Sequence, residues 1–436
     1  MPPQPSYDTD DLVAADRAHT WHPFTQMRAW CHPDHEPVVL VDGDGTVLRD
    51  SRGRKYLDGN SSIWTNLHGH NHPRLNAAIR DQLDRVAHTS FLGATNAPAA
   101  TLARKLTALF PPDTLTRTFF SDDGSTAVEV ALKMAVQFRQ LNGEPERHHF
   151  IAFDHAYHGD SAGAASVGGI DTFHGRFAAM QFPITRLASA EELTQIPDPA
   201  QISAVIIEPL VQGAAGIQIW PPGTLRTIRD WCDTHGVFLI LDEVLTGFGR
   251  TGTLFACQQE DVIPDFLCLA KGLTGGYLPL AATLTTETIF ERFLGEPADQ
   301  RTLYYGHSYT GNPLACAAAL ANLAIFRDEE TLTHLQPKIA HLATLLAPLR
   351  DHPHVREIRQ CGFITGIELV RHKASDEPYP WTDLTGARVC TRARDHGLLT
   401  RPVLDTLVLI PPFCTTPEQL KSMVDALHHA IDDVCC

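Results

Sequence analysis

Two apolar runs that each lead into charged residues dominate the middle of this sequence. The first, residues 237–241, is continuous enough for a strand buried on both faces, and it ends in Asp242 and Glu243. The second, residues 266–270, leads directly to Lys271 and the turn GLTGG. We expect a carboxylate and an amine to meet in a crevice where such strands end. Burial there would lower the pKa of the amine and make it a nucleophile toward carbonyls.

An acid and an amine that converge in this way suit pyridoxal phosphate (PLP). The lysine would form the Schiff base, and the aspartate would keep the pyridine nitrogen protonated so that the ring accepts electrons. Taken alone, Asp242 reads as a helix cap and Lys271 as a solvated turn lysine. Together the two residues favour a cofactor site.

The pattern along the chain predicts an α/β fold with two parts. From about residue 100 to 325, helical and strand-like segments alternate, which indicates a mainly parallel sheet covered by helices. Before this region, we interpret residues 12–30 as an arm without a helix of its own, and residues 37–60 as short antiparallel strands. The predicted units are an arm with small-domain strands (1–65), a large domain (66–332) and a C-terminal small domain (333–436), which the N-terminal strands complete.

Composition excludes several classes of function. The net charge of -16 and the lack of any Lys and Arg cluster argue against a nucleic-acid partner. The acidic, Pro-rich start and the lack of a long apolar run predict a cytoplasmic protein without a membrane span. His68, His70 and His72 alternate as in some metal sites, but no carboxylate or cysteine has matching spacing, so we expect a structural loop and no metal.

The segment SDDGST follows a predicted strand and opens a predicted helix. Free N–H groups and the helix dipole at such a point form a phosphate seat, and Gly124 lets the backbone approach closely. By itself the motif is more often an ordinary N-cap than a phosphate site. Tyr157, in a loop after the next strand, is either a half-buried loop residue or an aromatic cover for a flat cofactor ring.

The block LILDEVLTGFGRTG followed by LAKGLTGG resembles the signature of the class III aminotransferases. The resemblance implies the type I fold of PLP-dependent transferases, with Lys271 as the Schiff-base lysine and Asp242 beside the ring nitrogen. It also implies a homodimer in which the segment GHSYTGN of one subunit crosses the interface and contacts the phosphate of the PLP bound by the other subunit. In this family pattern, the remaining cofactor-binding residues are Gly124, Ser125, Tyr157, His158, His307 and Ser308.

Further segments, including WHPFTQM, DGNSSIWTN, AYHGD and LTRPVLD, resemble the branch of the family that serves biotin synthesis. This resemblance implies amination of the ketone of 8-amino-7-oxononanoate, with Arg401 on the substrate carboxylate; Arg401 could equally pair with Asp405. The branch that uses S-adenosylmethionine has a tyrosine and a Trp-Trp pair where this chain has Phe24 and Ile63-Trp64. The missing hydroxyl and indole remove a hydrogen bond and a stacking surface for that donor. Because these departures resemble the branch that uses lysine, we expect the amino donor to be either S-adenosylmethionine or lysine. The residues that would contact substrate are Phe24, Ile63, Trp64, Tyr157, Gly306 and Arg401.

Two alternatives stay open at this point. Another class III enzyme, such as an ω-amino acid:pyruvate transaminase or a semialdehyde aminomutase, would share the cofactor residues and differ at Phe24, Ile63 and Arg401. A non-catalytic PLP-binding protein would bind the cofactor but convert no amine.

Overall fold

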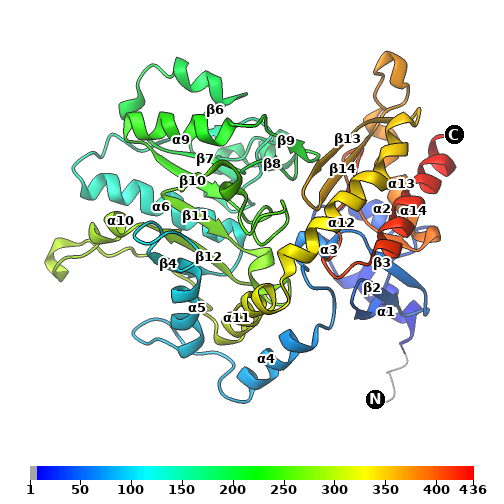
Figure 1. Ribbon diagram of the computed structural model, residues 1–436, viewed down its shortest axis with the longest axis horizontal. Coiled ribbons are helices and arrows are strands. Elements are labelled where there is room, and N and C mark those ends of the chain that lie inside the picture. Colours follow the sequence, from blue (N-terminus) through cyan, green and yellow to red (C-terminus); the bar gives the residue numbers. More distant parts are fainter. Residues whose placement is uncertain (1–6) are drawn as a thin grey trace.

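A seven-stranded sheet forms the centre of the larger part of the computed structural model, which describes residues 7–436 (Figure 1). Residues 1–6, the start of the predicted 1–65 unit, lie outside the described part. The strands are, in spatial order, β4 (Arg117–Ser121), β12 (Ala281–Thr285), β11 (Phe266–Leu269), β10 (Phe238–Asp242), β7 (Ile202–Ile207), β5 (His149–Phe153) and β6 (Thr185–Leu187).

All neighbouring strands from β11 to β6 run parallel, which confirms the predicted sheet. The exception is β12, which is antiparallel to both β11 and β4. The connection from β11 to β12 holds only the short 3-10 turn Lys271–Thr274, so it lacks the helix that a parallel crossover needs. Strand β12 was not predicted from the sequence.

Helices cover both faces of the central sheet. Strand alternation sends Leu239 and Leu241 of β10 into one core and Ile240 into the other. The first core includes residues of α5 (Ala97–Thr107), α9 (Thr224–His235) and α11 (Pro313–Asp328); the second includes α6 (Gly124–Leu141) and α7 (Ala162–Ser166). Helix α4 (Pro73–Leu83), which begins at Pro73, packs on α11.

The smaller part of the molecule contains two four-stranded sheets. One joins β1 (Leu40–Asp44), β2 (Val47–Asp50) and β3 (Lys55–Asp58) to β15 (Leu398–Leu399). The other holds β13 (Val355–Cys361), β14 (Ile364–Leu369), β17 (Thr406–Leu409) and β16 (Pro402–Val403). The pairing of β3 with β15 means that this part is built from both ends of the chain. The domain boundaries after residues 65 and 332 stay a prediction.

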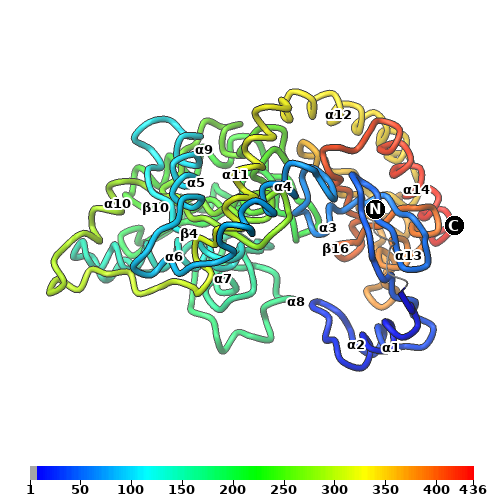
Figure 2. The backbone as a smooth tube through the Cα atoms, turned by 90° about the horizontal axis from the view of Figure 1, so that it is seen from below, coloured from blue at the N-terminus to red at the C-terminus, as the bar shows by residue number. Residues whose placement is uncertain are grey.

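Helices α12 (Thr331–Leu346), α13 (Thr385–Ala393) and α14 (Pro417–Cys435) complete this part, and Thr416 caps α14. The interpretation of the arm as free of helices was wrong, because α1 (Thr9–His19) and α2 (Met27–Trp30) form there, with Asp8 capping α1. Figure 2 shows this arm opposite α8 (Asp171–His174). No described helix is both long and apolar enough to cross a membrane.

Candidate active site

Three neighbouring parallel strands deliver charged residues to one cavity of about 420 Å³. Glu208 follows β7, Asp242 ends β10 and Lys271 follows β11, and all three line this cavity. The carboxyl ends of parallel strands are the usual place for ligands in α/β sheets. The predicted meeting of acid and amine is therefore present, with a second carboxylate that the sequence analysis did not single out.

Lys271 lies in the cavity wall with an unusual backbone conformation. Its φ of +41° is in the left-handed region, where a residue other than glycine is strained, and such strain clusters at functional sites. Burial lowers the pKa of Lys271 from its usual value, although Asp242 and Glu208 favour the charged form. The Lys271 Nζ atom lies 4.8 Å from the centre of the Trp64 ring. It is thus no solvated turn lysine.

Asp242 is buried and hydrogen-bonded to the imidazole of His158. Its Oδ2 lies 2.7 Å from Nδ1 of His158, so the imidazole donates to the carboxylate, while Oδ1 accepts the Val244 amide at 3.1 Å. Glu243 points the other way and accepts the amides of Ala256 and Cys257. Both carboxylates follow the same apolar run, but alternation along the strand lets only Asp242 reach the cavity.

Glu208 holds two loops that border the cavity. Its two oxygens accept the backbone amides of Tyr157 and Gly213, each at 3.0 Å. Burial raises the pKa of Glu208 to about 7. The signal for this residue was available in the sequence, since the apolar run before Glu208 ends in a carboxylate as the run before Asp242 does.

One end of the cavity is formed by the first turn of α6. Asp123 caps this helix by accepting the amide of Thr126 at 2.9 Å, and Gly124 and Ser125 line the cavity. A Cβ at Gly124 would lie 2.8 Å from a methyl carbon of Val244, and a Cβ at Gly159 would collide with Ser125 Oγ. The backbone approach therefore requires glycine at both positions, as a narrow seat at a helix N-terminus does.

Tyr157 lines the cavity beside these loops. Its hydroxyl donates to Asp160 at 2.7 Å, and its ring stacks on His174 with centroids 5.8 Å apart. Asp160 therefore orients the Tyr157 ring. Burial, followed by Asp160, raises the pKa of Tyr157, so the phenol stays protonated.

The structure brings only part of the predicted set together. The cavity wall contains seven of the predicted residues: Trp64, Gly124, Ser125, Tyr157, His158, Asp242 and Lys271. Six others lie outside it: Phe24, Ile63, Gly306, His307, Ser308 and Arg401.

Those six residues are not all remote from the cavity. Phe24 contacts Phe173, whose ring in turn contacts Tyr157. Nδ1 of His307 lies 3.4 Å from Asp122, which belongs to the wall. Arg401 is exposed, and within the described residues it forms no ion pair with Asp405, whose Oδ1 accepts the Gly386 amide instead.

Comparison with known proteins places this fold and site in one family. The aminotransferase class-III family matches residues 31–431, and the chain belongs to that family. The adenosylmethionine-8-amino-7-oxononanoate aminotransferases of Nitratidesulfovibrio vulgaris and Geobacter sulfurreducens are 49% and 45% identical to it, each over 99% of this chain and over 83% and 99% of their own lengths.

Solved structures agree with this placement. The adenosylmethionine-8-amino-7-oxononanoate aminotransferase of Methanocaldococcus jannaschii superposes with a TM-score of 0.96 at 41% identity, covering 98% of this chain and 100% of that one. An (S)-enantioselective omega-transaminase from Thermomicrobium roseum reaches a TM-score of 0.93 at 33% identity, covering 99% and 100%. The chain is a class III aminotransferase, an enzyme that uses PLP.

The residues present fit this cofactor. The cavity has the size of a small-ligand site, and its glycine-lined end at α6 suits a phosphate. Asp242 is an acid at its floor, and His158 Nε2 is buried without a hydrogen-bond partner among the described residues. Lys271 is the one lysine of the cavity wall.

Glu208 gives a test of the electrostatics at this site. Because folding raises its pKa from 4.5 to about 7, its contribution to stability is full below pH 4.5 and is lost as pH rises through 7. In cofactor-free protein this amounts to roughly 3 kcal/mol of the free energy of unfolding. Glu208→Gln should lack this part of the pH dependence in denaturant titrations between pH 4.5 and 7.5. Equal slopes in both proteins would show that Glu208 is charged throughout.

Proposed function

We propose that this chain transfers an amino group to the ketone of 8-amino-7-oxononanoate, giving 7,8-diaminononanoate in biotin biosynthesis. The observation that carries the proposal is the near full-length identity to relatives that bear this activity in their names. The cavity supports it, because its lysine, carboxylates and glycine-lined helix end are the groups that amino-group transfer requires.

When bound, PLP supplies an electron sink that stabilises negative charge at the carbon next to the transferred nitrogen. Lys271 would hold the cofactor and then move the proton between that carbon and the cofactor, a task for which a lowered pKa suits an amine. Asp242, oriented by His158, would keep the ring nitrogen protonated. Gly124 and Ser125 would bind the phosphate, and Tyr157 would cover the ring.

The active enzyme is proposed to be a cytoplasmic homodimer with shared sites. Ser308 is exposed, and Tyr304, four residues before it, is 89% exposed, as an aromatic residue covered by a second copy would be in the isolated chain. A second copy that covers this segment would bring Ser308, with Gly306 and His307, to its phosphate. Small molecules are the other proposed partners, with no nucleic acid and no membrane.

The substrate end is proposed to use residues of the smaller part and the arm. Arg401 is free to bind a carboxylate, since among the described residues it has no ion-pair partner. Phe24, Ile63 and Trp64 would border the chain of the substrate. The names of the relatives favour S-adenosylmethionine as donor. Phe24 and Ile63 instead favour lysine as the donor, so both donors are candidates.

A half-reaction measured by visible absorbance tests the proposal. The PLP-loaded enzyme is mixed separately with S-adenosylmethionine and with lysine, and one of them should bleach the absorbance. Adding 8-amino-7-oxononanoate should then restore it. Failure of that ketone to restore the absorbance would contradict the proposed substrate.

A second candidate is an ω-amine transaminase, favoured by the similarity to the Thermomicrobium roseum enzyme. In that case pyruvate or 2-oxoglutarate would restore the absorbance, and an ω-amine such as β-alanine would bleach it. The role proposed for Arg401 would then be wrong.

A further inference from the structure

The short helical turn α3 (Ser61–Trp64) carries the indole that covers Lys271, and its backbone is strained. Ser61, Ser62 and Trp64 have φ angles of +47°, +64° and +63°, in the region where side chains other than glycine meet steric repulsion. Ile63 between them is extended, with φ of -136°. Such a turn persists only where surrounding contacts hold it.

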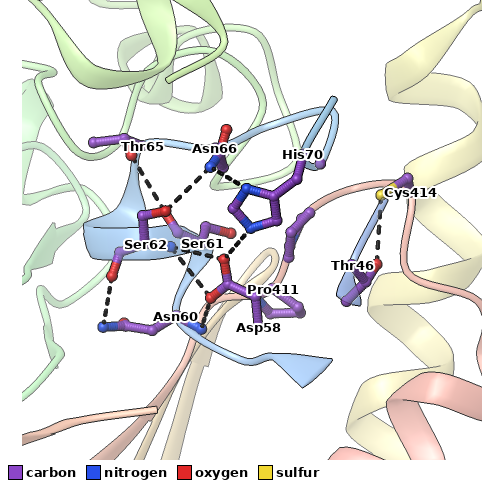
Figure 3. Close-up of polar contacts among 12 residues, drawn as sticks. Thr46, Asp58, Asn60, Ser61, Ser62, Thr65, Asn66, His70, Pro411 and Cys414 are labelled. Carbon is purple, nitrogen blue, oxygen red and sulfur yellow. Dashed lines mark hydrogen bonds and ion pairs between the residues drawn. The ribbon is translucent and has the colours of Figure 1, made fainter. Parts of the chain in front are cut away.

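The Asp58 carboxylate, 1% exposed, supplies the main contacts (Figure 3). Its Oδ1 accepts the amide of Asn60 at 3.1 Å, and its Oδ2 accepts the amide of Ser62 at 2.9 Å. Ser62 is the residue with the most unusual dihedral angles of the turn, with φ of +64° and ψ of -87°. Asp58 thus holds the turn at its most strained point.

His70 fixes the carboxylate in turn. Its Nε2 lies 2.8 Å from Oδ2 of Asp58, and its Nδ1 lies 3.3 Å from the side-chain nitrogen Nδ2 of Asn66, an atom that can only donate (Figure 3). The neutral imidazole therefore accepts at Nδ1 and donates from Nε2 to the carboxylate. Asn66 also donates to Ser62 Oγ at 3.1 Å, so the same network reaches the turn twice.

The turn passes this constraint to the cavity. The backbone amide of Asn60 donates to Asp58, and the side-chain oxygen of Asn60 accepts a hydrogen bond from the Trp64 indole at 2.8 Å. The indole lies over the Lys271 amine, and a Cβ on Gly213 would lie 3.1 Å from it, so it has little room to shift toward that loop. Beyond the turn, Arg250 donates to the Asn66 carbonyl at 2.9 Å.

We propose that Asp58, backed by His70, is a positioning residue of the reaction, which holds the strained turn so that the Trp64 indole stays over the Lys271 amine. This inference rests on the proposed function, because it gives the turn a part in amino-group transfer. It assigns a role to two residues that do not themselves line the cavity.

Hydrogen exchange in cofactor-free protein tests the structural half of the inference. In Asp58→Asn, one N–H of the new amide faces a backbone N–H or His70, and the amides of residues 62–65 should exchange at least about tenfold faster. The matched control is Asp50→Asn, a carboxylate 2% exposed that holds the far end of the same hairpin. The control should leave residues 62–65 unchanged. Unchanged exchange in Asp58→Asn, or equal acceleration in Asp50→Asn, would overturn the inference.

A double-mutant cycle tests the link to Lys271. Asp58→Asn should lower kcat/KM about 10-fold or more, and Asp58→Asn combined with Trp64→Ala should be no worse than Trp64→Ala alone. Losses that simply multiply would show that Asp58 acts on stability and not through Trp64. The kinetics use whichever amine bleaches the enzyme, and the exchange needs no substrate. Failure of the proposed acceptor therefore leaves both tests readable.

Discussion

Replacing Lys271 with alanine is expected to abolish aminotransferase activity, with kcat reduced by about 10⁴-fold or more. The residue is the one lysine of the cavity wall, and its lowered pKa makes it the amine best suited to bond PLP and to move a proton. The variant should still bind PLP through the α6 end of the cavity, but without the visible absorbance of lysine-bound cofactor. Absorbance spectra and steady-state rates measure both effects.

Chemical rescue makes this prediction sharper. A small added amine should restore part of the rate of Lys271→Ala, because it replaces the proton carrier without replacing the chain. Lys133→Ala is the matched control, since Lys133 is an α6 lysine paired with Glu129 outside the cavity wall. It should keep the absorbance and the rate. High activity of Lys271→Ala without an added amine would contradict the assignment.

Replacing Asp242 with asparagine is expected to have the second largest effect. The amide keeps the shape of the side chain but has no negative charge. The carboxylate that it replaces accepts the Nδ1–H of His158, and its charge would hold the ring nitrogen protonated. We expect kcat to fall by about 10²-fold to 10³-fold, with the lysine-bound absorbance still present but shifted. Rates and absorbance spectra, measured as for Lys271, show whether charge or shape matters.

The neighbouring residue provides the control for Asp242. Glu243→Gln changes a buried carboxylate in the same strand end, but this carboxylate accepts the amides of Ala256 and Cys257 away from the cavity. It should cost about 1–3 kcal/mol of the free energy of unfolding and leave the absorbance of the cofactor unshifted. Equal absorbance shifts in Asp242→Asn and Glu243→Gln would contradict the assignment of Asp242 to the ring nitrogen.

The strand-end pattern made the centre of the site predictable. A continuous apolar run fixes a buried strand, so the charged residues that follow must lie at the sheet edge, and both Asp242 and Lys271 do. The start of α4 at Pro73 and the Thr416 cap of α14 were predictable because their signals are local.

What sequence reasoning missed depends on tertiary context. The direction of β12 follows from a connection too short for a crossover. The left-handed angles of Ser61, Ser62 and Trp64 run against the local preference of those residues and are sustained by Asp58, whose contacts no pattern in the chain announces. The roles proposed for Phe24 and Arg401 involve a bound substrate, and the role proposed for Ser308 involves the phosphate site of a second copy, so neither follows from the pattern of one chain.

Reductive trapping tests the role of Lys271 directly, because it identifies the lysine that bonds the cofactor. The PLP-loaded enzyme is treated with borohydride and digested, and the peptide that carries the added mass of reduced cofactor is sequenced by mass spectrometry. We expect a single modified residue, Lys271, and no modification in Lys271→Ala. Modification of another lysine in the wild-type enzyme would contradict it.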